Sequence, residues 1–210
     1  MSMIRLLPTF ALAAMLATGC SVFNRDTPAT ASFMLDAPPQ QKVQGASLGS
    51  VMIRSLAAVQ PYDSRAFVYK MAGGEWRYDS YNGFLCAPSD MMTDAVARAF
   101  QASGRFDLVA TPSVATVTEL ATEIVVEEMY SDFSDAAKPR AIVKLRMYLL
   151  ERASGRSGVV AQSVGVASVA ISESSPKAVA DALSAAAGQA IGQLVAALPA
   201  QKPAVVPPKQ

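Results

Sequence analysis

The chain has 210 residues, with 18 lysines and arginines against 17 aspartates and glutamates, so its formal net charge is +1. That balance argues against a nucleic-acid-binding protein, which needs a basic surface to neutralise phosphates. The sequence contains no histidine, which excludes Ser-His-Asp and Cys-His nucleophile pairs and every zinc site that uses histidine. Its two cysteines are too few for a four-cysteine metal site. The composition therefore favours a protein that is not an enzyme.

The first nineteen residues have the layout of an export signal. Arg5 gives a basic start, residues 6–17 form an apolar run, and small residues precede Cys20. The run is too short for a membrane-spanning helix, which needs roughly 20 apolar residues. The segment Ala17-Thr18-Gly19-Cys20 resembles a bacterial lipobox, the site of lipoprotein signal peptidase. We therefore expect residues 1–19 to be a lipoprotein signal peptide and Cys20 to be lipidated.

The expected lipid anchor also predicts a location. Several acyl chains on one N-terminus give an essentially permanent attachment to a membrane. Ser21 stands where lipoproteins kept in the inner membrane commonly have aspartate, so the resemblance implies the outer membrane, with the protein facing the periplasm. Residues 20–31 are small, polar and interrupted by proline, which predicts a short lipidated tether.

Short strands and one hairpin are expected after the tether. Residues 33–35 predict an edge strand, and residues 48–56 contain a second strand. The segments 66–71 and 75–79 flank Gly73-Gly74, which predicts a β-hairpin.

A helix and a further short strand should follow the hairpin. Apolar residues recur at helical spacing between Ser89, the expected N-cap, and Gly104, where the helix should end. Residues 106–110 predict a short strand.

Two long strands carry opposite charges on one face. Apolar residues alternate with glutamates over 120–126 and with basic residues over 143–149, as in a half-buried antiparallel sheet. The glutamate spacing also fits a helix, which stays open, although the β-branched residues there favour a strand. A third long strand is predicted at 159–171. The residues expected to pair across the two charged faces are Glu119, Glu123 and Glu127 with Lys144 and Arg146.

The last helix is predicted to start at Ser175-Pro176, a cap followed by proline at the first helical position. A continuous apolar stripe runs from there to Leu198, and Gly188 and Gly192 should let the helix lie close against the sheet. Residues 199–210 contain four prolines and predict a disordered tail.

These elements predict one α+β domain over residues 32–198. Its sheet should be largely antiparallel or mixed, with two main helices, about 89–103 and 176–198, packed on it.

The motifs that could indicate catalysis or metal binding lack the residues or the spacing that such sites need. Gly45-Ala46-Ser47-Leu48-Gly49 matches the G-x-S-x-G string, but a loop precedes it, a strand follows it, and the triad lacks its histidine. The three glutamates would lie roughly 13 Å apart along one strand, too far to share an ion. We therefore expect no catalytic residue, metal or cofactor. Cys86 is expected to be a buried thiol, with an intermolecular disulfide as the alternative.

Aromatic residues are crowded between positions 62 and 84, with basic residues interleaved. Alternate rings could fill the core beneath the hairpin. The other interpretation is that several rings are exposed and form a patch that contacts protein or lipid. The aromatic residues are Tyr62, Phe67, Tyr69, Trp76, Tyr78, Tyr81 and Phe84.

The order of these pieces resembles the ABC-type transport auxiliary lipoproteins. These are the PqiC-like outer-membrane partners of mammalian-cell-entry (MCE) lipid transport systems. The resemblance rests on the lipobox, the opening segment 32–39, the segment 61–70 and the helix after Pro88, and it covers most of residues 32–198. One departure is Gly83-Phe84, where the family often has a tryptophan.

The resemblance implies a non-enzymatic component of an envelope-spanning system. The implied partners are a periplasmic MCE-domain protein with its inner-membrane permease and ATPase, and the implied cargo is lipid or another hydrophobic molecule. We expect Tyr62, Arg65 and Trp76 to contact the partner; a homo-oligomer stays open and nucleic acid is not expected. The alternative is a structural lipoprotein for outer-membrane assembly or secretion, whose partner would be a barrel or secretion component.

Overall fold

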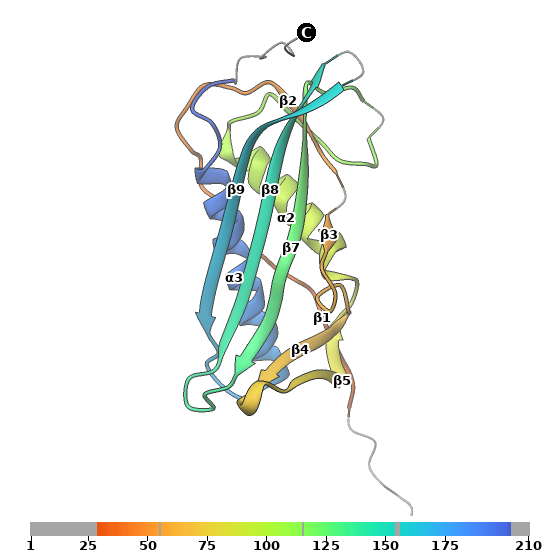
Figure 1. Cartoon of the computed structure of the whole chain (residues 1–210), viewed down its shortest axis with the longest axis vertical. Coiled ribbons are helices and arrows are strands. Elements are labelled where there is room, and N and C mark those ends of the chain that lie inside the picture. The colour runs from red at the N-terminus through yellow and green to blue at the C-terminus, as the bar shows by residue number, and fades with distance from the viewer. Residues whose placement is uncertain (1–28, 55, 115, 154–155, 203–210) are drawn as a thin grey trace, which may run out of the picture.

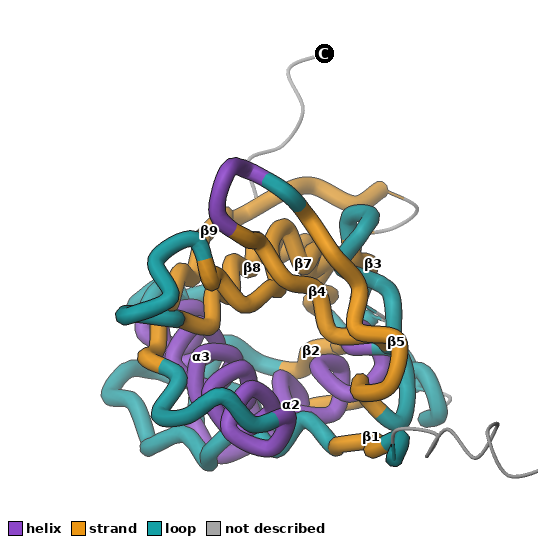
Figure 2. The backbone as a smooth tube through the Cα atoms, turned by 90° about the horizontal axis from the view of Figure 1, so that it is seen from below, coloured by secondary structure: helices purple, strands orange, loops and turns teal. Residues whose placement is uncertain are grey.

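The computed structural model describes residues 29–54, 56–114, 116–153 and 156–202. The expected signal peptide, the lipidation site Cys20 and residues 203–210 of the predicted tail lie outside this part of the chain. Over the described residues, a curled nine-stranded sheet carries two helices, both packed on the same face (Figures 1 and 2).

Three long strands form the centre of the sheet. β7 (Leu120–Phe133), β8 (Arg140–Ala153) and β9 (Arg156–Ala170) pair antiparallel in chain order. Their apolar side chains, such as Ile124 and Leu145, are buried beneath the helices, while the charged ones face outward. The predicted strands are therefore confirmed, and the helix that stayed open for the glutamate segment is wrong.

A β-bulge interrupts the pairing of β7 and β8 between Val126 and Glu128. An extra residue in a strand moves every later side chain to the opposite face. Val126 and Met129 are both buried as a result, and Tyr130 faces outward.

The other edge of β7 pairs with three short strands placed end to end. β2 (Ser50–Ile53), β3 (Ala57–Ala58) and β4 (Ala66–Met71) each run parallel to β7, from its first residues to its last. β6 (Leu108–Ala110) extends the sheet beyond β2.

The predicted hairpin is confirmed and continues the sheet beyond β4. β5 (Trp76–Phe84) pairs antiparallel with β4, and β1 (Ala31–Phe33) pairs parallel with β5. The turn between β4 and β5 is the 3-10 segment η1 (Ala72–Gly74), in which Gly73 has φ 76° and the following Gly74 φ 81°. β1, β4 and β5 thus lie at one end of the long strands, and β2 and β6 lie toward the other (Figure 1).

The two helices are α2 (Pro88–Ser103) and α3 (Pro176–Ala196). The predicted cap of α3 is confirmed, since the Ser175 side chain accepts a hydrogen bond from the Ala178 amide at 3.2 Å. The predicted cap of α2 is wrong: the N-cap is Ala87, and the Ser89 hydroxyl donates to Asp63. Pro88 lacks an N–H and fits the first helical turn, so the helix begins one residue earlier.

Glycines allow α3 to pack closely against its neighbours, but Gly188 and Gly192 do not face the sheet as predicted. Gly188 and Gly192 face the segment 36–40, because an added Cβ would lie 2.4 Å from Pro38 Cδ and 2.6 Å from Gln40 Oε1. The close approach of α3 to the sheet comes instead from Gly165 of β9.

The predicted α+β fold with two main helices is confirmed. One continuous core joins both helices to the inward face of the sheet. Neither helix of the described residues has the length and apolar character needed to span a membrane.

Candidate partner-contact surface

The aromatic residues between positions 62 and 84 divide between the two faces of the sheet. Phe67 and Phe84 are buried, with ring centroids 5.0 Å apart, and belong to the core. Trp76, Tyr78 and Tyr81 are about half exposed, at 46%, 53% and 46%. Each of the two interpretations of the aromatic crowding therefore describes part of the group.

Three rings meet on the face of the sheet that the helices leave uncovered. Trp76 lies 4.9 Å from Tyr130 and 6.4 Å from Tyr62, and Tyr62 lies 6.0 Å from Tyr130, measured between ring centroids. We call these three residues the aromatic cluster. They come from the turn after β3, the start of β5 and the end of β7, so the fold brings together residues far apart in the chain.

Strand register explains why the rings face outward. Lys70 of β4 is directly opposite Trp76 of β5 and Asp132 of β7, and directly opposite residues share a face. The Lys70 ammonium lies 3.5 Å from the Asp132 carboxylate on that face. Tyr130 precedes Asp132 by two residues and points the same way.

The two phenols of the aromatic cluster stay protonated at neutral pH. Partial burial raises the pKa of Tyr62 above its ordinary value, and the nearby Glu128 carboxylate raises it further. Burial and Glu128, in that order, also raise the pKa of Tyr130. Neutral, partly buried phenols beside an indole offer a partner both apolar area and hydroxyl donors.

A neutralised charge ladder lies beside the aromatic cluster. Glu127 accepts hydrogen bonds from Arg146, and the Lys144 ammonium lies 3.1 Å from the same carboxylate. The bond from Arg146, followed by that from Lys144, holds the pKa of Glu127 below its usual value, although burial opposes the shift. This part of the outward face therefore carries little net charge.

The predicted pairing of all three glutamates with β8 is correct only for Glu127. Glu123 pairs with Arg54, and Glu119 pairs with Lys202 at 3.1 Å. Both lie toward the start of β7, where β2 is the neighbouring strand, so nearer cations from outside β8 satisfy them.

Two of the three predicted contact residues come together. Tyr62 and Trp76 share the aromatic cluster, whereas the Arg65 guanidinium donates to the Leu85 carbonyl at 3.4 Å, beside β1. Sequence reasoning missed Tyr130, because simple alternation with Val126 would put it in the core. The adjacent glutamates Glu127 and Glu128, followed by the apolar Met129, were the signal for a bulge.

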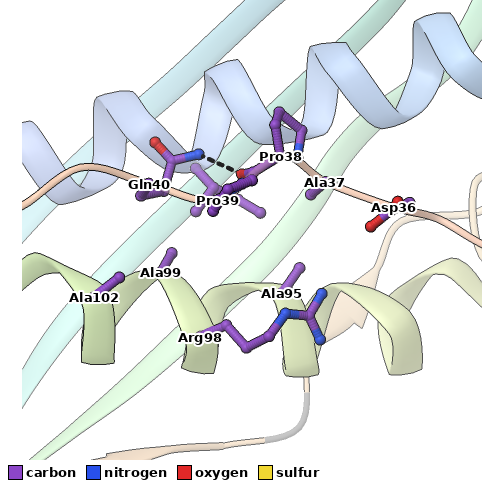
Figure 3. Close-up of a pocket in the computed structure, with 10 residues that line it drawn as sticks. Asp36, Ala37, Pro38, Pro39, Gln40, Ala95, Arg98, Ala99 and Ala102 are labelled. Atoms are coloured by element: carbon purple, nitrogen blue, oxygen red, sulfur yellow. Dashed lines mark hydrogen bonds between the residues drawn. The ribbon is translucent and has the colours of Figure 1, made fainter.

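A groove lies between the two helices (Figure 3). Residues 36–40 run between α2 and α3 and border a groove of about 260 Å³. Gln40 Nε2 donates to the carbonyls of Pro38 at 3.0 Å and Gly188 at 2.9 Å, and the Asp36 amide donates to Ser184 Oγ at 3.1 Å. The floor on the α2 side consists of the small residues Ala95, Ala99 and Ala102, with Arg98 beside them.

The other residues that the sequence suggested for chemistry, Ser47 and Cys86, do not form a catalytic site. Ser47 is exposed in the loop before β2, and its hydroxyl accepts a bond from the Gly49 amide, so no nucleophile elbow forms. Cys86 is half-buried against the core, less buried than expected, and is a free thiol. Among the described residues, no group of three cysteine, aspartate or glutamate side chains is placed to hold a metal ion.

Solved structures share this fold. The protein XCC0632 from Xanthomonas campestris superposes with a TM-score of 0.68 at 23% identity, over 79% of this chain and 92% of that one. An uncharacterized protein superposes with a TM-score of 0.57 at 9% identity, over 80% and 95% of the two chains. No curated protein matches the sequence.

The sequence also matches a known protein family. The model of the ABC-type transport auxiliary lipoprotein component matches residues 33–195. The chain belongs to this family, as its resemblance suggested, and is an auxiliary lipoprotein component of an ABC-type transport system.

Proposed function

We propose that this chain is an outer-membrane lipoprotein that docks the periplasmic MCE-domain protein of a lipid transport system. The family match over residues 33–195 carries the proposal, because it defines an auxiliary lipoprotein of ABC-type transport. In this proposal residues 1–19 are removed, Cys20 carries the lipid, and residues 20–31 tether the domain on its periplasmic side. An inner-membrane permease and ATPase would complete the system, and lipid or another hydrophobic molecule would be the cargo.

The aromatic cluster is the proposed docking surface. Tryptophan and tyrosine are enriched among the residues that dominate binding energy at protein interfaces. Trp76 is 46% exposed although it contacts two other rings, so apolar area is available without rearrangement of the domain. The neutralised ladder around Glu127 adds a polar border of the kind that surrounds protein interfaces.

The test is cross-linking in intact cells, followed by purification of the C-terminally tagged protein in detergent and mass spectrometry. We expect an MCE-domain protein to be recovered together with its permease and ATPase. Recovery of a barrel or secretion component in their place would support the structural-lipoprotein alternative and overturn the proposal. Self cross-links alone would count against the MCE-domain protein and against the barrel or secretion component as partners.

The lipid anchor is tested in the same cells. A Cys20→Ser variant should lack the acyl mass that the wild-type protein carries on residue 20, as measured by mass spectrometry. An unprocessed or non-acylated wild-type chain would contradict the proposed attachment.

A further inference from the structure

Large apolar side chains are exposed where the chain enters the domain. Met34 follows β1 and is 57% exposed, and Leu85 follows β5 and is 55% exposed. The Leu85 amide donates to the Phe33 carbonyl at 2.9 Å, so the two segments lie side by side. Tyr81, 46% exposed, belongs to the same strand pair.

These three exposed side chains gather where β1 pairs with β5. Ser32 is opposite Gly83 in the β1–β5 register, so Met34 and Leu85, each two residues further on, share their face. Tyr81 lies two residues before Gly83, beside the irregularity of β5, and its side chain is also exposed. Phe33 and Phe84 take the opposite face and pack in the core. We call Met34, Tyr81 and Leu85 the tether-side patch.

A cation borders the tether-side patch. The Arg65 side chain is exposed, and its guanidinium donates to the Leu85 carbonyl at 3.4 Å. Aliphatic residues, a tyrosine and a basic side chain together are typical of protein surfaces at the membrane interface, where rings and cations meet lipid headgroups. Arg65, which is not part of the aromatic cluster, thus lies at the border of the tether-side patch.

The tether length limits where this patch can lie. Ten residues separate Cys20 from Ala31, the first residue of β1, so eleven residue-to-residue steps join the two, and these span at most about 40 Å. β8 alone, with 14 residues, is roughly 46 Å long at about 3.3 Å per residue. A domain anchored through Cys20 must therefore keep β1 nearer to the bilayer than the length of its own long strands.

We infer that the tether-side patch rests on the headgroup region of the leaflet that holds the lipidated Cys20. This inference rests on the proposed lipid anchor. The end of the domain with β1 and β5 then faces the membrane, and the opposite end of β8 and β9 points away from it (Figure 1). A lipid surface is the occupant, because β1 is the part of the domain that the anchor keeps within reach of lipid.

The test is depth-dependent fluorescence quenching in the full-length lipidated protein. Trp76 is the one tryptophan of the sequence, so a Trp76→Phe background leaves no indole. Leu85→Trp in that background reports on the tether-side patch. Val159→Trp is the matched control, since Val159 is 59% exposed and pairs with Leu150 near the far end of β8. Both replacements enlarge an exposed apolar side chain, so neither should disturb folding.

Each protein is reconstituted into phosphatidylethanolamine and phosphatidylglycerol vesicles that contain brominated acyl chains. We expect the indole introduced by Leu85→Trp to be quenched several-fold more than the one introduced by Val159→Trp. Equal quenching of the two, in protein that floats with the vesicles, would overturn the inference and leave the lipid anchor standing. Failure of the wild-type protein to float would overturn the anchor and this inference with it.

Discussion

Gly165 of β9 lies directly against the backbone of Ala190 in α3. A Cβ at position 165 would be 2.2 Å from the Ala190 carbonyl oxygen, a distance that side-chain carbons do not tolerate. The neighbour is backbone in the middle of a helix, so it cannot move aside alone. The helix and the edge strand therefore pack at a separation that only glycine allows.

Gly165→Ala should lower the free energy of unfolding by about 1–3 kcal/mol, the usual cost of overpacking a filled interface. Chemical denaturation of the domain measures this loss. The matched control is Gly158→Ala in the same strand, where an added Cβ meets nothing within 4 Å. That variant should be neutral or slightly more stable, since alanine restricts the unfolded chain. Equal stability of the two variants would show that α3 shifts freely on the sheet.

Replacement of the buried Arg105 should also lower the free energy of unfolding strongly. Arg105 is 2% exposed, and its guanidinium donates to the carbonyls of Ala46 at 3.0 Å, Pro199 at 2.5 Å and Ala200 at 3.2 Å. Arg105→Met would leave these carbonyls without their donor and should cost about 3 kcal/mol. The exposed Arg98→Met is the control and should change stability by less than about 0.5 kcal/mol.

The same substitution has a readout at the C-terminus. Arg105 attaches the start of the predicted tail to the loop before β2, and Lys202 pairs with Glu119 beyond it. Arg105→Met should therefore make the chain after Leu198 more sensitive to carboxypeptidase, measured by intact mass. Unchanged trimming would mean that other contacts hold this segment.

Local patterns predicted most of the fold. The alternation in β7 and β8, the Gly73-Gly74 turn and the Ser175-Pro176 cap each depend on residues within a few positions of one another. Such signals are present in the sequence before any tertiary contact forms. They placed the three long strands, the hairpin and both helices near their observed positions, whereas the strand expected at 33–35 lies at 31–33 and β3 was not predicted.

What the sequence did not predict depends on contacts between distant segments. Tertiary packing determines three such features: the bulge that turns Tyr130 outward, the contact of Pro38 with Gly188 and the burial of Arg105. Ser89 is not the cap because the helix already begins at Pro88, and the Ser89 hydroxyl donates to Asp63, 26 residues away. The aromatic cluster was predicted in part for the same reason: Tyr62 and Trp76 belong to the crowded aromatic segment of the sequence, whereas Tyr130 lies far from it along the chain.

Glu127 should make stability depend on pH. Its folded pKa lies below the ordinary value of 4.5, chiefly through the bond from Arg146, so its contribution is present above pH 4.5 and is lost as the pH falls through the folded pKa. Glu127→Gln should lower stability by about 0.5–1 kcal/mol at pH 7, as expected for a partly exposed pair. At pH 3 the difference from wild type should shrink toward zero.

Urea denaturation at pH 7, 5 and 3 measures this dependence. Asp94→Asn removes an exposed carboxylate that has no ion pair among the described residues, and it serves as the control for the loss of one charge. A Glu127→Gln deficit that stays constant down to pH 3 would mean that packing, and not the ion pairs, is responsible.

The aromatic cluster predicts a loss of partner binding without a loss of fold. Combined Tyr62→Ala, Trp76→Ala and Tyr130→Ala should reduce recovery of the cross-linked partner about tenfold or more, since buried interface aromatics each contribute about 2 kcal/mol. Tyr78→Ala is the control, because Tyr78 is 53% exposed on the same strand but outside the cluster. Arg65→Ala alone should have a smaller effect, and wild-type recovery by the triple variant would exclude this surface.

Gln193 of α3 covers part of the free edge of β9. Its side-chain amide accepts from the Val166 N–H and donates to the Val166 carbonyl, both at 2.8 Å, and so occupies the groups that a further strand would use. β9 pairs with β8 on one side and exposes Val164 and Val166 to solvent. An uncapped edge of this length and apolar character is a template for pairing with a second chain.

Gln193→Ala should therefore increase self-association more than it lowers stability. Light scattering after size exclusion, over a range of concentrations, should show the variant forming dimers or larger species at concentrations where wild type does not. Gln189→Ala, an exposed glutamine one turn earlier on α3, is the control and should behave as wild type. If the two variants have the same mass distribution, the edge is protected by the twist of β9 and not by the amide of Gln193.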